Sequence, residues 1–214
     1  MNGTAPALII FEIVVLLFSA ILHEIAHGFM AEKLGDDTAR RAGRLTLNPL
    51  VHIDLFGSIL LPAILYIASG GSFFFAAAKP VPYNPQNLKY PRSGSAKIAL
   101  AGPCTNLILA IVFGIAVRIG IAFSAPDIFI SLLAIIVYIN IALAIFNLIP
   151  IPPLDGSRVL FAALPQSRAT FRAAYFLERY GIILVLVFAF FGFGLLLTPI
   201  QYLFSIFTGQ PLPF

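Results

Sequence analysis

Two histidines and a glutamate stand close together in an otherwise apolar stretch of this 214-residue chain. Residues 23–27 read HEIAH, so His23 and His27 are four positions apart. On a helix, side chains at that spacing project from the same face, and two imidazoles placed in this way can chelate one Zn²⁺ ion. The pattern therefore predicts a metal site on a helix.

Glu24 lies between the two histidines and is rotated from them by about 100° on 3.6-residue helical geometry. In zinc sites of this kind such a glutamate acts as general base on the attacking water, whose pKa the metal lowers toward about 7. A lone HExxH in a soluble helix is weak evidence. In a membrane helix, three ionisable groups within five residues are costly, and they therefore indicate function.

A third ligand is expected, because a catalytic zinc usually has three protein ligands and one open position. The only other histidine is His52, so a carboxylate is the favoured donor. The strongest candidate is Asp155, in the segment NLIPIPPLDG at residues 147–156. Its prolines force an extended exit from a helix, and Gly156 permits a turn that aims the carboxylate back at the bundle. A solvated aspartate in a proline-rich loop is the alternative reading.

The composition indicates the medium in which these residues work. Hydrophobic residues make up 60% of the chain and charged residues 10%, and the mean hydropathy is +0.99. Soluble domains are close to half apolar and about a quarter charged. The sequence is therefore that of a membrane protein.

A spanning helix needs about 20 largely apolar residues. The candidate segments are residues 6–29, 53–69, 96–123, 128–149 and 181–197. We predict an all-α polytopic membrane protein with four to five transmembrane helices. Residues 1–214 are expected to form a single membrane-embedded domain, with a core at about 6–160 and a C-terminal helix at about 181–197.

The basic residues lie in clusters at residues 33–44, 79–97 and 158–179, with Arg118 alone near the end of the apolar segment at residues 96–123. Under the positive-inside rule the three clusters are cytoplasmic, and the Arg118 turn and the N-terminus are external. Contact with anionic headgroups explains the net charge of +4 better than nucleic acid does.

Strict alternation of five spans would place the first two basic clusters on opposite sides of the membrane. We therefore expect that residues 53–78 do not form a single crossing of the membrane. This stretch is rich in glycine, and the prolines of residues 78–91 exclude a regular helix there. The prediction is a re-entrant or short β element at residues 53–83. A single spanning helix with an imperfect charge bias is the alternative.

The two motifs together resemble the site-2 protease family of intramembrane zinc metalloproteases. That family pairs HExxH on one helix with N-x-x-P-x-P-x-x-D-G on another, and both are matched here without departure. The resemblance also includes LNP at residues 47–49, AKP at 78–80, AGP at 101–103 and Asn106, and it covers roughly residues 10–160. The length is similar to that of the minimal bacterial branch without a PDZ domain.

The resemblance implies that His23, His27 and Asp155 hold one zinc ion per chain and that Glu24 is the general base. It also implies that Asn147 stabilises the oxyanion. An amide donor in a low-dielectric site can contribute about 3 kcal/mol to that stabilisation. Helix capping or an interhelical contact by Asn147 is the alternative.

Three further polar residues are notable. Glu12 lies three helical turns before His23 on the same face, so we expect it to point into the bundle. Asn140 faces the same way as Asn147 and is expected to form an interhelical hydrogen bond. His52 is expected to make a local contact. By the resemblance, the extended segment near residues 78–82 pairs with the substrate as an added strand, and residues 70–83 could supply that edge.

The predicted function is an intramembrane zinc metalloendopeptidase that cleaves transmembrane or membrane-proximal segments of membrane proteins. Its expected partners are those substrates and the lipid bilayer, with no nucleic acid; its expected location is the cell membrane, as a bacterial inner-membrane protein. The alternative is a zinc transporter or a metal-binding membrane protein without hydrolysis. Transport sites distribute ligands for alternating access and often show internal repeats, and the sequence shows neither.

Overall fold

The computed structural model describes residues 4–54, 60, 67, 78–192 and 194–212. The main helices are α1 (Thr4–Lys33), α2 (Thr38–Arg41), α4 (Pro91–Ala122), α5 (Asp127–Asn147), α6 (Asp155–Ala163), α7 (Arg168–Val187) and α8 (Gly194–Thr208). Short 3-10 helices cover Pro49–Val51 and Pro85–Asn87, and a π-helical turn covers Phe188–Gly192. The described residues contain no β-strand, so the all-α fold is confirmed.

Within the described part of the chain, four helical segments are long and apolar enough to cross a membrane. They are Pro6–Lys33, Pro91–Ala122, Asp127–Asn147 and Arg168–Gly192. The multi-pass character and three of the predicted spans are thereby confirmed. The predicted span at residues 53–69, and most of the re-entrant or β element at residues 53–83, lie outside the described residues.

The prediction of one C-terminal helix over residues 181–197 is wrong in its bounds. Helix α7 already begins at Arg168, because the side chain of Ser167 accepts a 3.1 Å hydrogen bond from the backbone N–H of Thr170. It ends at Val187, where a π-helical turn follows, and α8 begins at Gly194. Hydropathy located only the apolar half of α7, whereas the capping residue decides where the helix starts.

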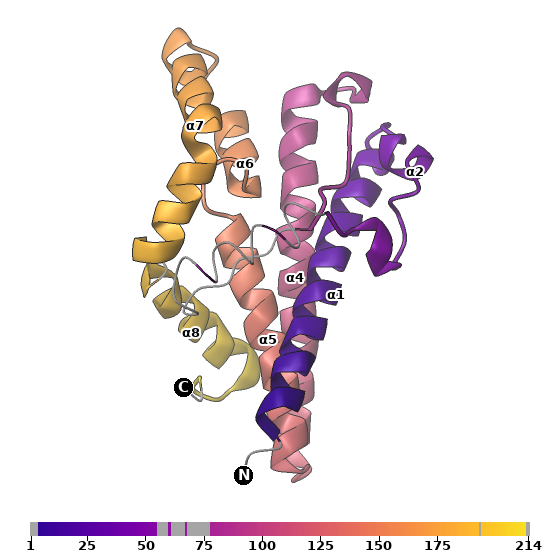
Figure 1. Cartoon of the computed structure of the whole chain (residues 1–214), viewed down its shortest axis with the longest axis vertical. Coiled ribbons are helices and arrows are strands. Elements are labelled where there is room, and N and C mark those ends of the chain that lie inside the picture. The colour runs from indigo at the N-terminus through magenta and orange to yellow at the C-terminus, as the bar shows by residue number, and fades with distance from the viewer. Residues whose placement is uncertain (1–3, 55–59, 61–66, 68–77, 193, 213–214) are drawn as a thin grey trace.

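Helices α4 and α5 form an antiparallel hairpin, with α1 beside it and α8 across its lower part (Figure 1). Helix α1 ends, and α4 begins, at the upper end of the molecule in that view, close to α2. The N-terminus and the α4–α5 turn lie at the opposite end. The connection between α1 and α4 therefore begins and ends on the same side of the bundle.

The core of the bundle lies where α4, α5 and α8 meet. Its fully buried side chains include Val117, Val137, Ile141 and Ile200. Small residues on α4 let a neighbouring helix come close: a Cβ on Gly114 would lie 2.8 Å from the Cβ of Phe207. Close packing of this kind holds helices together in lipid, where apolar burial alone gives no drive for association.

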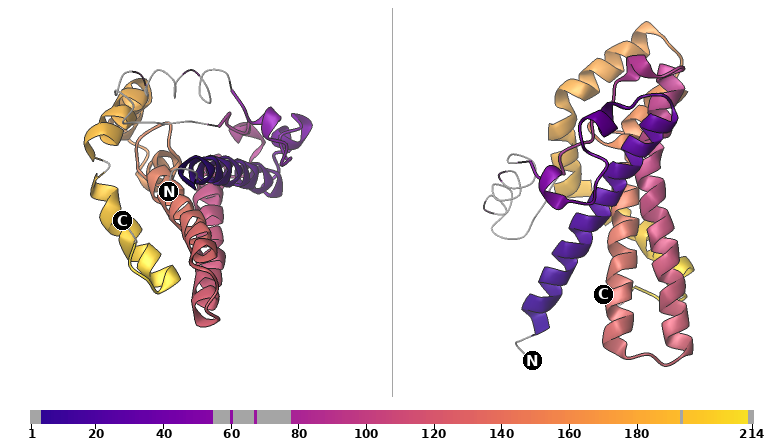
Figure 2. Two further views of the ribbon diagram at one scale, coloured as in Figure 1. Left: turned by 60° about the horizontal axis from the view of Figure 1, so that its bottom comes forward. Right: turned by 90° about the vertical axis from the view of Figure 1, so that its right-hand side faces the viewer.

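Helix α1 packs on the hairpin only through its C-terminal half. Its N-terminal half diverges from α4 and α5, as the right-hand view of Figure 2 shows. Glu12 is consequently exposed, and the prediction that it points into the bundle is wrong. The helical period gave its face correctly, but none of the helices in the described part of the chain covers that face at this level.

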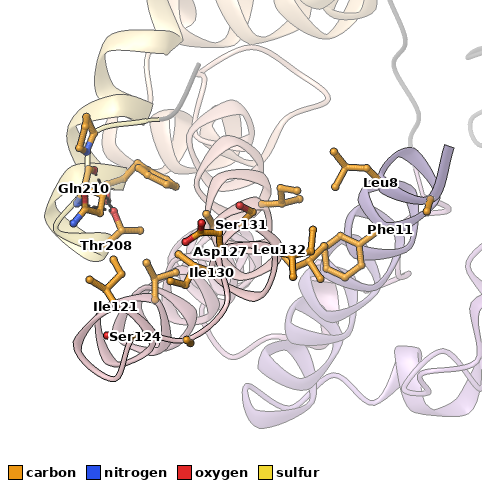
Figure 3. A pocket seen from close by; sticks show the side chains of 18 residues that line it. Leu8, Phe11, Ile121, Ser124, Asp127, Ile130, Ser131, Leu132, Thr208 and Gln210 are labelled. Atoms are coloured by element: carbon orange, nitrogen blue, oxygen red, sulfur yellow. Dashed lines mark hydrogen bonds between the residues drawn. The ribbon is translucent and has the colours of Figure 1, made fainter. Parts of the chain in front are cut away.

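A large cavity occupies the space left by this divergence. It measures about 1550 Å³, and its lining includes Leu8 and Phe11 from α1, Asp127 and Leu132 from α5 and Gln210 beyond α8 (Figure 3). None of the five predicted site residues lines it. The candidate chemistry lies elsewhere, so cavity size does not locate the site in this protein.

Candidate metal centre

His23 and His27 of α1 meet Asp155, the first residue of α6. The Oδ2 atom of Asp155 lies 3.0 Å from Nε2 of His23 and 3.2 Å from Nε2 of His27. All three side chains are buried, and their ligand atoms lie within 4.8 Å of one another. Ligands about 2.1 Å from a tetrahedral zinc are about 3.4 Å apart. The donor set and its spacing therefore fit one zinc ion.

The second nitrogen of each imidazole is also engaged. Nδ1 of His27 donates a 2.7 Å hydrogen bond to the backbone carbonyl of Ile98, and Nδ1 of His23 lies 2.5 Å from Oδ1 of Asn106. A carbonyl oxygen only accepts, so each Nδ1 carries a proton, and a metal beside Asp155 would take the place of any proton on Nε2. With a metal bound, each Nε2 would present its lone pair to the space beside Asp155, as a metal ligand requires.

Gly156 lets α6 start close enough to α5 to bring Asp155 to the histidines. A Cβ on Gly156 would lie 2.1 Å from the carbonyl oxygen of Leu148. The expected turn at this glycine is wrong, because Gly156 lies within α6. The missing side chain serves close approach of two backbones instead.

Glu24 faces an unexpected partner. Its Oε2 atom accepts a 2.8 Å hydrogen bond from the backbone N–H of Val81. Because Val81 stands between Pro80 and Pro82, it is the only one of these three residues with an N–H to donate. The AKPVP segment therefore lies directly against the predicted general base.

The main chain of this segment is also bound at other points. The N–H of Lys79 donates to the carbonyl of His52 at 2.8 Å, and the guanidinium of Arg44 donates to the carbonyls of Lys79 and Pro80 at 2.9 and 3.2 Å. Arg44 is buried, so its expected role in a headgroup-binding cluster is wrong. In the predicted substrate edge, the N–H groups of Lys79 and Val81 and the carbonyls of Lys79 and Pro80 are therefore hydrogen-bonded within the protein. Most of residues 70–83 lies outside the described chain.

Asp36 holds the chain just after the AKPVP segment, and sequence reasoning missed it. The residue is fully buried, and its carboxylate accepts hydrogen bonds from the backbone N–H of Asn84 at 2.6 Å, from Nδ2 of Asn87 at 2.7 Å and from Thr38. Burial alone would raise the pKa of Asp36. The bonds from Thr38, Asn87 and Asn84 outweigh it and lower the pKa below its ordinary value of 3.8. An acidic residue directly after Gly35 at the end of a helix was the available signal.

Asn147 is half-buried at the end of α5. Its Nδ2 donates a 2.9 Å hydrogen bond to the carbonyl of Leu143 in its own helix. The oxyanion role therefore stays a prediction.

His52 is buried and its Nε2 donates to the carbonyl of Thr46 at 2.8 Å, which confirms the expected local contact.

Two kinds of comparison with known proteins agree with this site. The family model described as "Peptidase family M50" matches residues 115–188, a range that contains the NLIPIPPLDG segment. The chain is 37% identical over 186 residues to "Putative zinc metalloprotease YwhC" of Bacillus subtilis, covering 82% of this chain and 78% of that protein. No solved structure matches the chain.

Two further relatives are more distant. "Putative zinc metalloprotease Rip2" of Mycolicibacterium smegmatis is 34% identical over 86% of this chain, and "Putative zinc metalloprotease MJ0611" of Methanocaldococcus jannaschii is 34% identical over 65% of it. The chain spans 65% and 63% of these two proteins.

Membrane-length helices around a buried His, His and Asp group define a multi-pass membrane metalloprotease. The similarity to the relatives narrows this class to one peptidase family. The chain belongs to peptidase family M50, the site-2 protease family, and it is a zinc metalloprotease.

Proposed function

We propose that the protein is an intramembrane endopeptidase that cleaves transmembrane or membrane-proximal segments of other membrane proteins. The observation that carries the proposal is the convergence of His23, His27 and Asp155 on helices of a membrane-spanning bundle. His23 lies ten residues before Lys33 at the end of α1, which is about 15 Å at 1.5 Å per residue. A group at that depth acts inside a hydrocarbon core about 30 Å thick.

In this proposal, one zinc ion per chain is held by the two Nε2 atoms and the carboxylate of Asp155. When bound, zinc supplies Lewis acidity toward the scissile carbonyl and lowers the pKa of a bound water to near neutrality. Glu24 removes the proton from the attacking water through Oε1, since Oε2 holds the N–H of Val81. The amide of Asn147 turns from Leu143 to donate to the developing oxyanion.

We also propose the orientation of the chain in a bacterial inner membrane. The N-terminus and the α4–α5 turn face outward, while α2, the start of α4 and the start of α7 face the cytoplasm. The two groups lie at opposite ends of the bundle (Figure 1). The three basic clusters belong to the second group, as the positive-inside rule requires.

A reconstituted cleavage assay tests the proposal. The purified chain is incorporated into liposomes with a candidate single-pass membrane protein, and the product ends are mapped by mass spectrometry. We expect cuts within the apolar segment or at its border, abolished by a zinc chelator and restored by added zinc. Cleavage that persists with the chelator, or cuts confined to soluble domains, would contradict the proposed function.

A further inference from the structure

A chain of buried polar side chains leads from α5 through α4 to the metal-facing His23. Nδ2 of Asn140 donates to the carbonyl of Ile136 at 2.9 Å and to Oγ of Ser19 at 3.0 Å. Oδ1 of Asn140 accepts a 2.9 Å hydrogen bond from Nδ2 of Asn106, and Oδ1 of Asn106 lies 2.5 Å from Nδ1 of His23. Both asparagines are completely buried.

Backbone carbonyls fix the direction of the hydrogen bonds in this chain, and one of them is the carbonyl of Ser19, to which Nδ2 of Asn106 donates at 3.4 Å. The carbonyl of Ile136 only accepts, so the amide nitrogen of Asn140 must point to it and its oxygen must point to Asn106. The nitrogen of Asn106 therefore faces Asn140, which leaves its oxygen for His23. An oxygen in that place holds the imidazole proton on Nδ1 and keeps Nε2 free for a metal.

We infer that Asn106 and Asn140 are positioning residues that set the tautomer and ring orientation of His23 for zinc binding. The inference rests on the proposed zinc site but concerns residues that do not touch the metal. Outer partners of ligating histidines fix ring orientation and raise ligand basicity, and their loss typically lowers metal affinity by about 10- to 100-fold. Asn140 acts one step further away, by keeping the amide of Asn106 from turning over.

If the two asparagines had a purely structural role, their loss would affect stability rather than zinc affinity. Interhelical hydrogen bonds between α1, α4 and α5 would stabilise the bundle, and their loss would lower the melting temperature without a specific effect on zinc. Thr208 offers a matched control. It is a buried polar residue at the end of α8, and its hydroxyl donates to the carbonyl of Phe204 at 2.8 Å.

The test measures zinc affinity by competition with a chelator, together with the melting temperature of the zinc-free protein in detergent. We expect Asn106→Leu to bind zinc about 10- to 100-fold more weakly, and Asn140→Leu to be weakened as well. Asn106→Asp keeps an oxygen acceptor for His23 but loses the donor to Asn140, so it should bind zinc more tightly than Asn106→Leu. Thr208→Val should lose stability only. The visible spectrum of the cobalt-substituted protein should change in Asn106→Leu and not in Thr208→Val.

The double variant Asn106→Leu/Asn140→Leu is the sharpest comparison. If Asn140 acts through Asn106, the double variant binds zinc no more weakly than Asn106→Leu alone. Unchanged zinc affinity in either single variant, or full additivity in the double variant, would overturn the inference. Should Asn106→Leu fail to fold, the affinity of Asn140→Leu decides alone. If the wild-type chain binds no zinc, both the inference and the proposed zinc site are overturned. If the wild-type chain binds zinc and the variants bind it equally well, only the inference is overturned.

Discussion

The imidazole of His23 occupies the space where Gly102 would carry a side chain. A Cβ built on Gly102 would lie 2.4 Å from Nε2 of His23 and 2.6 Å from its Cε1 atom. Contacts this short do not occur between unbonded atoms, so the ring can adopt its metal-facing position only because α4 has no side chain there. The side chain that approaches α4 at Gly102 is thus a predicted zinc ligand.

Replacement of Gly102 by alanine should therefore displace His23 and remove most of the bound zinc. Gly120→Ala in the same helix is the control, since a Cβ there would meet its neighbours at 3.6 Å or more. Zinc content per chain, measured by elemental analysis, should fall in the first variant and stay at the wild-type value in the second. Full zinc content in Gly102→Ala would show that His23 does not need this position to bind.

Asp155→Ala should likewise lose zinc, because three protein ligands with one open position leave no spare donor. Asp127→Ala is matched to it, since each aspartate begins a helix and only Asp155 faces the histidines. Elemental analysis of both purified variants makes the comparison. Undiminished zinc in Asp155→Ala would remove it as the third ligand.

Asn147→Ala should retain zinc while kcat falls by about 10²- to 10³-fold, the scale seen when one oxyanion donor is removed. The loss of stability should be small, because the amide bonds only to a carbonyl of its own helix. Asn147→Asp should be slower still, since it places negative charge where negative charge develops. Turnover, zinc content and melting temperature are measured on the same preparations. Wild-type turnover in Asn147→Ala would exclude the oxyanion role; parallel losses of zinc and stability would point to a structural one.

Asp36→Asn should destabilise the protein by about 1–3 kcal/mol at neutral pH, because one amide cannot accept all the hydrogen bonds of the buried carboxylate. The folded pKa of Asp36 is lowered below 3.8, so its ionised form stabilises the fold above that pH. This contribution is lost as the pH falls through the folded pKa. The difference in melting temperature between wild type and Asp36→Asn should therefore shrink in acid.

Asp37→Asn is the control for this measurement, because Asp37 pairs with the exposed side chain of Arg41 and such pairs contribute little. A stability difference for Asp36→Asn that stays constant from neutral pH to below 3.8 would contradict the assignment.

Much of the architecture could be predicted from the sequence, because long apolar runs and the positions of prolines are local properties. The same reasoning paired the HEIAH helix with Asp155, whose side chains the structure places together. Sequence reasoning failed where the burial of a side chain depends on which other helix or loop covers that face of its helix. Glu12 was placed on the correct side of α1, but the helix diverges from the bundle there.

The contacts of the AKPVP segment show the same limit. Arg44 lies among basic residues that resemble a headgroup-binding cluster, and only the folded chain shows it bonded to the carbonyls of Lys79 and Pro80. The hydrogen bond from Val81 to Glu24 joins residues 57 positions apart, and no periodicity or motif encodes that distance. The predicted C-terminal helix was misplaced because hydropathy marks only the apolar residues of α7, whereas its start is set by the cap at Ser167.

We propose that Glu24 is the base of a zinc-dependent peptide hydrolase, and the variant Glu24→Gln tests this role. Glu24→Gln retains an oxygen that can accept the N–H of Val81, so the AKPVP segment stays in place, but it has no basic oxygen for the attacking water. Zinc per chain and proteolytic turnover are measured together on wild type and on this variant. We expect one zinc in each and nearly complete loss of turnover in Glu24→Gln. Substantial proteolysis by the zinc-loaded variant would contradict this role.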